Sequence, residues 1–125
     1  MAGIKRVEDL VVYRNSLSYL KDIYTISYSI PHLKHRTQIN NSTEAIPPLI
    51  AEGFAKQRNP RESSRFYEMA MAESDETVAH LRKAIILSAR FPRINATLCN
   101  DLIEKYQILL KQLNRLATIW RKFGD

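Results

Sequence analysis

The sequence predicts an all-α protein: an up-down-up-down antiparallel four-helix bundle that forms a single domain over residues 1–125. Four segments carry apolar residues at alternating steps of three and four, which is the repeat of a helix with one buried face. Short breaks with proline, glycine or polar residues separate these segments, and no segment shows the period-two alternation of a strand. With 45% hydrophobic and 26% charged residues, the composition is that of a soluble globular protein.

The first helix is expected from Val7 to Ile30, and Pro31 ends it. Glu8 and Asp9 place negative charge at its start, which favours the helix dipole. The predicted buried stripe consists of Leu10, Tyr13, Leu17, Leu20, Tyr24 and Ser27.

The second helix is expected from Arg36 to Gln57, and it holds the proline pair Pro47-Pro48 in its middle. Each proline removes a backbone donor and crowds the preceding turn, so we expect a kink or a short break there. The predicted apolar side carries Ile39, Ile46, Ile50 and Phe54.

The third helix is expected to start at Asn59-Pro60, because asparagine favours the cap position and proline the first helical position. Phe91-Pro92 ends it. Its predicted buried side contains small residues that allow close packing, and comprises Phe66, Met69, Ala70, Thr77, Leu81, Ala84, Ile85 and Ser88.

The fourth helix is expected from Ala96 to Lys122, with Gly124 just past its end. Its stripe is the most regular of the four, and comprises Leu102, Tyr106, Leu109, Leu113, Leu116 and Trp120.

Further apolar residues lie off these stripes and predict a second apolar face for contacts between subunits. A monomer with scattered surface apolar residues is the alternative. The residues are Val12, Tyr19, Ile23, Ile26, Ile103, Leu110 and Ile119.

The chain carries a net charge of +6, which favours polyanionic partners such as RNA or DNA. In an up-down bundle both chain ends and the second connection meet at one end, so ten basic residues gather there against five acidic ones. This end can bind phosphates of nucleic acid or an acidic partner, with Tyr67 and Phe123 placed for stacking on bases; a solvated basic end is the alternative. The ten candidate binding residues are Lys5, Arg6, Arg14, Lys56, Arg58, Arg61, Arg65, Arg115, Arg121 and Lys122.

No catalytic constellation is recognisable, and the sequence predicts a non-enzymatic protein without a cofactor. Glu76 and His80 do not have the spacing of a di-metal bundle, and Ser63 and Ser64 have no histidine and acid beside them. The single cysteine, Cys99, is expected in the core. An enzyme with a buried carboxylate site remains an alternative, with bound metal as its signature.

His32 and His35 lie beside Lys34 and Arg36 in the first connection, where they either join a phosphate-binding patch or face water. No signal peptide or membrane span is recognisable, which predicts a cytoplasmic protein.

The chain resembles the four-helix-bundle proteins encoded in intervening sequences of bacterial large-subunit ribosomal RNA genes, the S23-like family. The resemblance is carried by Asp9-Leu10-Val11-Val12-Tyr13, by Leu113-Asn114-Arg115-Leu116, and above all by a motif in the second helix. The motif residues are Gln38, Ile39, Ile46, Pro47, Ile50, Ala51, Glu52 and Gly53.

The resemblance implies a non-enzymatic homo-oligomer, typically a pentamer, with a positively charged surface. The closing helix with Trp120 is also similar to accessory proteins of diversity-generating retroelements, which assist a reverse transcriptase and its template RNA. The family's arginine pair is Asn40-Asn41 here, so a binding role of those arginines does not transfer. We expect Gly53 to allow close helix approach and Glu52 to pair with a cation or cap free backbone donors, with ligand binding by Glu52 as the alternative. A module that binds proteins only is the second functional hypothesis.

Overall fold

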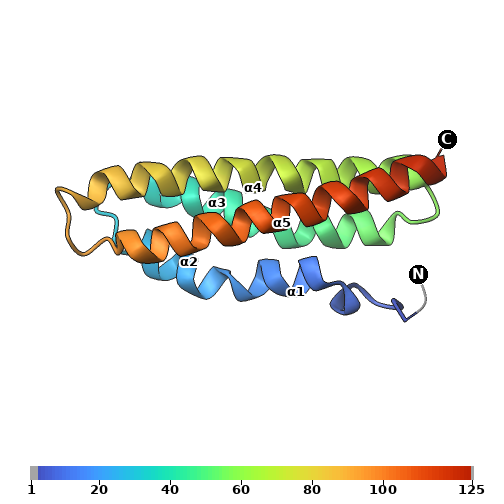
Figure 1. The fold of residues 1–125 in the computed structure, drawn as a ribbon, viewed down its shortest axis with the longest axis horizontal. Coiled ribbons are helices and arrows are strands. Elements are labelled where there is room, and N and C mark those ends of the chain that lie inside the picture. The colour runs from blue at the N-terminus through green and yellow to red at the C-terminus, as the bar shows by residue number, and fades with distance from the viewer. Residues whose placement is uncertain (1–2, 125) are drawn as a thin grey trace.

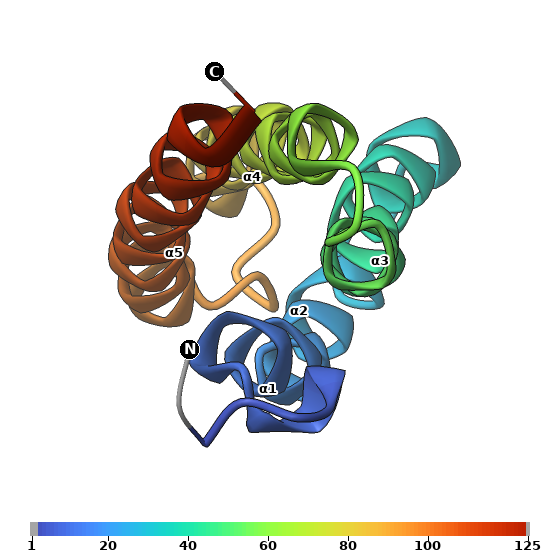
Figure 2. The same ribbon diagram turned by 90° about the vertical axis from the view of Figure 1, so that its right-hand side faces the viewer.

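A computed structural model describes residues 3–124, and these residues form an all-α fold without strands, as predicted. Four helical rods surround a common interior (Figure 2). The elements are η1 (Val7–Asp9), α1 (Val11–Ser18), α2 (Leu20–Ser27), α3 (Leu33–Ala55), α4 (Pro60–Ser88) and α5 (Ala96–Gly124).

Both chain ends and the α3–α4 connection lie at one end of the rods, and the α2–α3 and α4–α5 connections lie at the other (Figure 1). Seen along the rods, α4 lies between α3 and α5, and the rod formed by α1 and α2 closes the ring (Figure 2). None of the helices in residues 3–124 has the length and apolar character that crossing a membrane requires.

The first rod differs from the single helix predicted over Val7–Ile30. It is divided into η1, α1 and α2, and α1 and α2 meet at Tyr19, whose ring packs edge-on against the buried ring of Tyr106 at 5.4 Å. The predicted stripe is correct for Leu10 and Ser27 but wrong for Leu17, which is 44% exposed. The buried residues before and after Tyr19 follow one helical repeat, so the predicted stripe was assigned to a neighbouring face of the same rod. They are Val12, Ser16, Ile23, Ile26 and Ile30.

Four residues that we assigned to an outer subunit face belong to the core of this chain. Val12, Ile23, Ile26 and Ile103 are all 9% exposed or less. The first three lie on the face of the first rod that is buried, next to the face that was predicted, and Ile103 is adjacent to the stripe residue Leu102. These residues therefore give no support to a second apolar face.

The proline pair does not break α3, which runs unbroken from Leu33 to Ala55 with Pro47 buried and Pro48 exposed. The expected short break is therefore wrong, and a kink at this point stays a prediction. Ile39, Ile46 and Ile50 face the interior with exposures of 1% or less, as predicted.

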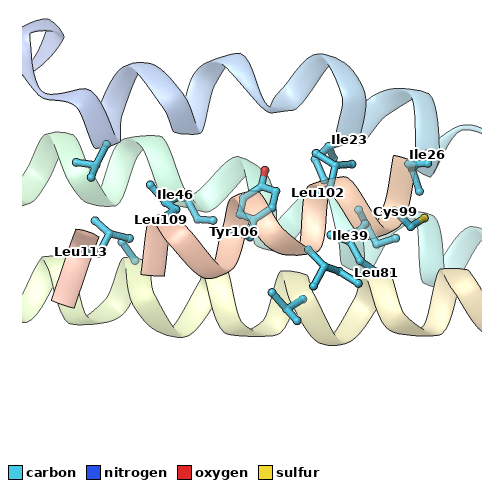
Figure 3. Packing of buried hydrophobic residues seen from close by; sticks show 14 of the residues in the cluster. Ile23, Ile26, Ile39, Ile46, Leu81, Cys99, Leu102, Tyr106, Leu109 and Leu113 are labelled. Atoms are coloured by element: carbon cyan, nitrogen blue, oxygen red, sulfur yellow. The ribbon is translucent and has the colours of Figure 1, made fainter. Parts of the chain in front are cut away.

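Apolar side chains from all four rods meet in one core (Figure 3). On α5, Leu102, Tyr106, Leu109 and Leu113 are fully buried, which confirms the predicted stripe. Cys99 is fully buried too, and burial raises the pKa of its thiol to about 11.

Helix α4 begins as predicted, because the Asn59 side chain accepts a hydrogen bond from the Glu62 N–H at 3.4 Å and Pro60 is the first helical residue. Its buried face departs from the prediction at Met69, which is 41% exposed, and at Tyr67, which is 1% exposed. Tyr67 is therefore a core residue and is not available to stack on bases.

The buried hydroxyls of α4 bond to the backbones of both neighbouring helices. Ser63 donates to the Gly53 carbonyl at 2.6 Å, Ser64 to the Ala117 carbonyl at 2.7 Å and Ser74 to the Tyr106 carbonyl at 3.0 Å. Gly53 lies in the last turn of α3, where helix carbonyls lack a partner within the helix. Because serine side chains are short, these bonds require α3 and α5 to pack close to α4.

Gly53 also lies against the ring of Tyr67. An added Cβ at Gly53 would approach Tyr67 Cε1 to 2.7 Å, which is closer than van der Waals contact permits. At this position the missing side chain leaves space for a ring of α4, and the expected role of Gly53 in close helix approach stays a prediction.

We predict that Gly53→Ala lowers the free energy of unfolding by about 1–2 kcal/mol, although alanine is the better helix former by about 1 kcal/mol. Overpacking a closed core costs roughly 1–3 kcal/mol, and the buried Tyr67 ring has no room to move. Urea unfolding followed by circular dichroism measures the change. In a Tyr67→Leu background the same substitution should cost nothing or stabilise; an equal cost in both backgrounds contradicts the contact.

We also predict that Ser74→Ala lowers the free energy of unfolding by about 1 kcal/mol, since it removes a buried bond between two helices. Ser18→Ala is the matched control, because the exposed Ser18 hydroxyl bonds only to Asn15 within its own helix. Its change should stay within about 0.5 kcal/mol. Equal effects in thermal or urea unfolding would show that the bond between helices adds nothing.

Candidate nucleic-acid interface

The ten candidate binding residues all have exposed side chains, and we call this set the terminal pole. They come from the N-terminal segment and α1, from the α3–α4 connection and the start of α4, and from the last part of α5, which lie toward one end of the rods (Figure 1). The fold therefore provides an exposed basic surface at the end where both described chain ends lie.

Asp9 shapes the N-terminal part of the terminal pole. Its carboxylate accepts hydrogen bonds from the backbone N–H groups of Lys5 and Arg6, both at 3.0 Å, and these bonds lower the pKa of Asp9. Arg14 Nη1 donates to the Glu8 carbonyl at 2.8 Å. The backbone beside Lys5 and Arg6 is thereby fixed while their side chains stay in solvent.

Three arginines of the terminal pole come together where α4 and α5 pack against each other. Arg61, Arg65 and Arg121 line one recess of about 180 Å³ together with Ser64 and Glu68. Asn59 and Pro60 start α4 just before Arg61, and the bond from Ser64 to the Ala117 carbonyl holds α4 against α5. Three arginines are thus carried by two rigid helices.

Glu68 is a member of this cluster that the sequence reasoning missed. Arg121 Nη2 contacts Glu68 Oε1 in an ion pair between two half-exposed side chains. Glu68 follows Arg61 by seven residues and Arg65 by three, so all three lie on one face of α4, and this spacing was the available signal. The acid reduces the net charge of the recess and orients Arg121.

The other members of the terminal pole do not join this recess. Arg115 lies in a separate, mostly apolar recess of about 240 Å³ with Ile4, Asp9 and Leu116. Lys56 and Arg58 lie in the α3–α4 connection and make no ion pair within residues 3–124. The ten residues share an end of the molecule without forming one pocket.

Of the two aromatic side chains expected to stack on bases, only Phe123 is accessible. It is 67% exposed and packs edge-on against Trp120 at 5.4 Å between ring centres.

The motif residues of α3 divide into core and surface. Ile39, Ile46, Pro47, Ile50 and Gly53 are buried, so the motif mainly specifies helix packing. Gln38 is half-buried and its Oε1 accepts a bond from Lys83 Nζ on α4 at 3.3 Å, while Ala51 is half-buried.

Glu52 does not do what we expected of it. Its side chain is exposed and has no ion pair or hydrogen bond with any other residue of 3–124. The carbonyl of Glu52, rather than its carboxylate, accepts the Lys56 N–H at the end of α3. The motif glutamate is thus a free surface charge beside the α3–α4 connection.

The charge of the chain changes sign twice along the rods, which the sequence reasoning also missed. Residues 23–43 and 77–100 contain six basic residues, all three histidines and no acid, and they meet at the end away from the chain termini (Figure 1). We call these two segments the distal pole. With Glu68 counted at the terminal pole, the region between the poles holds seven acids against three lysines, so positive charge is not concentrated at the terminal pole alone.

Two histidines of the distal pole, His35 and His80, have lowered pKa values, and burial is the largest cause for both. Burial lowers the pKa of His35, and Lys83, His32 and Lys34 lower it further. Burial and Lys83 likewise lower the pKa of His80, and the nearby Glu76 carboxylate opposes this change. The absence of acids within residues 23–43 and 77–100 was the sequence signal for this second basic region.

The serines and the cysteine considered for catalysis are buried and contribute to helix packing. Ser63 and Ser64 are buried and donate to main-chain carbonyls, and the thiol of Cys99 lies in the apolar core. Among residues 3–124 no three histidine, cysteine, aspartate or glutamate side chains are grouped so as to hold a metal ion.

Comparison with known proteins places the chain by its sequence family. Residues 8–115 match the model of the family described as 23S rRNA-intervening sequence protein. Searches among curated proteins and among solved structures found no match. The match covers α1 to α4, most of α5 and the whole motif of α3, so this chain belongs to the 23S rRNA-intervening sequence protein family.

Proposed function

We propose that this protein is a non-enzymatic scaffold that binds structured RNA, or the enzyme that acts on it, through the terminal pole. The observation that carries the proposal is the recess in which Arg61, Arg65 and Arg121 project from two packed helices. Arginine presents a planar set of donors that suits phosphate oxygens. The description of the family, an rRNA intervening sequence protein, is consistent with a role connected to nucleic acid.

Binding of this kind reads the shape and phosphate spacing of the nucleic acid rather than its base sequence. Contacts to phosphates fix position but carry no sequence information. Ten exposed basic side chains distributed over one end of the molecule fit such a role better than a role in base-specific recognition. The affinity then falls steeply with salt, because each contact displaces counterions.

We further propose that the chain acts as a cytoplasmic homo-oligomer, a pentamer as the family resemblance implies, in which consecutive rods are antiparallel and α3 bends at its proline pair. Large apolar side chains that are 41–73% exposed support self-association. They include Leu17, Leu33, Met69, Ile86 and Ile108. By the same resemblance, a reverse transcriptase is the proposed enzyme partner.

A module that binds only proteins is the second candidate. The apolar recess formed by Ile4, Leu10, Val11, Val12 and Leu116 favours it, because a groove of about 240 Å³ with few polar groups suits an apolar side chain. Binding to a partner protein in the absence of nucleic acid, with no affinity for RNA, distinguishes this candidate.

The RNA proposal predicts that a triple variant, Arg58→Gln, Arg61→Gln and Arg65→Gln, binds a structured RNA hairpin more weakly. Each lost phosphate contact should reduce the slope of log affinity against log salt by about one. Fluorescence anisotropy across a salt series measures both quantities.

The matched control replaces three exposed lysines of the acidic middle region, Lys21, Lys105 and Lys111, by glutamine. It removes the same charge at a different place, so its slope should stay near that of the wild type. Equal losses in the two triple variants would show that net charge alone drives binding, and no loss in either would remove the proposal.

The oligomer proposal predicts a mass of five times the 14.5 kDa chain in analytical ultracentrifugation. Met69→Glu and Ile86→Glu place charge on exposed apolar positions, and these variants should reduce the measured mass while circular dichroism stays unchanged. Sedimentation of the wild type as a 14.5 kDa species would exclude the pentamer.

A further inference from the structure

A recess opens at the distal pole, on the end of the molecule opposite to the chain termini. It has a volume of about 310 Å³, within the range of small-ligand sites. The α2–α3 connection, the first turn of α3 and the α4–α5 connection form its wall. The lining residues are Tyr28, Ser29, Ile30, Pro31, Arg36, Arg90, Phe91, Pro92 and Arg93.

Three arginines and no acid line this recess. Arg90 and Arg93 are exposed, and none of the three arginines makes an ion pair within residues 3–124. The recess at the terminal pole, in contrast, contains Glu68. The positive charge at the distal recess is therefore available to an external anion.

Arg36 is held in place before any ligand arrives. Its Nη2 donates to the Ile30 carbonyl at 2.9 Å, and its guanidinium lies over the Tyr28 ring at 5.7 Å from the ring centre. Its Nε is buried without a hydrogen-bond partner among the described residues. Since a guanidinium has five N–H donors, most of its bonding capacity remains unused.

An aromatic surface adjoins the arginines. Tyr28 is 65% exposed although it is a large aromatic residue, and its ring lies 6.1 Å from the ring of Tyr24. On the other wall Phe91 packs edge-on against His32 at 5.8 Å. Base rings stack on accessible aromatic side chains of this kind.

From this combination we infer that the distal recess binds the phosphate monoester of a nucleotide, with Arg36, Arg90 and Arg93 around the phosphate and Tyr28 stacked on the base. A phosphate monoester carries close to two negative charges at neutral pH, whereas an internal phosphodiester carries one. Three unneutralised arginines in one recess match the doubly charged group. The nucleotide is either free or the 5′ end of a strand, and the two share this chemistry.

The inference does not depend on the proposed function, because the two sites use different residues at opposite ends of the rods. The experiment compares the full chain with two short single-stranded RNAs of one sequence, labelled at the 3′ end, of which one has a 5′ phosphate and the other a 5′ hydroxyl. The wild type should bind the phosphorylated strand about tenfold more tightly or better, as charge-assisted bonds of roughly 1.5–3 kcal/mol imply. Equal affinity for the two strands would overturn the inference.

Arg90→Gln with Arg93→Gln should abolish the preference for the 5′ phosphate. The matched control is Lys34→Gln with Arg82→Gln, which removes equal charge from exposed side chains of the distal pole that do not line the recess. It should retain the preference, and loss of the preference in both double variants would show a diffuse field instead of a site. Arg58→Gln, Arg61→Gln and Arg65→Gln at the terminal pole should leave the preference unchanged, so the two proposals fail separately.

The role of Tyr28 and the source of the phosphate have their own readouts. Tyr28→Leu should lower the affinity for both strands by a similar factor while the phosphate preference persists, because stacking does not depend on the end group. An unchanged affinity would exclude stacking on Tyr28.

AMP should compete with the phosphorylated strand and adenosine should not. If AMP competes with an affinity equal to that of the phosphorylated strand, the recess is assigned to free nucleotides; if its affinity is much lower, the recess is assigned to strand ends. Competition by adenosine as strong as that by AMP contradicts phosphate recognition.

Discussion

The close approach of α3 and α5 to α4 is the constraint on which the rest of this structure depends. Short side chains on α4 make it possible: Ser63, Ser64 and Ser74 each donate a hydrogen bond to a main-chain carbonyl of a neighbouring helix. Such bonds require the backbones to be near each other, and they satisfy hydroxyls that would otherwise be buried at a cost. The same contact between α4 and α5 fixes the arginines of the terminal pole relative to one another.

The motif residues of α3 provide the surface against which α4 packs. Gly53 leaves room for the Tyr67 ring, and its carbonyl accepts the Ser63 hydroxyl, so one residue without a side chain serves two contacts. Pro47 is buried within an unbroken helix. A helix that lacks two backbone donors depends on its neighbours for stability, and the packing of α3 against α4 provides it. The motif therefore preserves an architecture, while its charged member, Glu52, lies free in solvent.

Regular periodicity was a sound guide where a helix carried it on one face only. The stripe of α5 and the isoleucines of α3 are buried as expected, and the cap at Asn59 is where the turn chemistry placed it. The first rod was predicted less well, because two neighbouring faces of it carry apolar residues at helical spacing, and the buried face is the one with Val12, Ile23 and Ile26. The prediction for Tyr67 was wrong, because an aromatic residue close to basic residues in the sequence suggests stacking on bases. In the structure its ring fills the space beside Gly53. Counting charge by segment found the terminal pole, but pooling all remaining residues concealed the cancellation between the distal pole and the acidic middle.

That alternation of charge gives the molecule a property that neither end has alone. Because both ends of the molecule are positive and the middle region is negative, the charge distribution has a small dipole moment along the rods and a large quadrupole moment. A distant polyanion is therefore attracted to either end, without preference between the two. A 29-residue helix is about 44 Å long, which exceeds the screening distance of roughly 8 Å in physiological salt several times over. The two ends therefore act independently, and an RNA that reaches both must bend away from the acidic middle region. If copies of the chain lay parallel and side by side, each pole and each acidic middle region would face its counterpart of the same charge. Low ionic strength should therefore oppose this lateral assembly, and added salt should favour it.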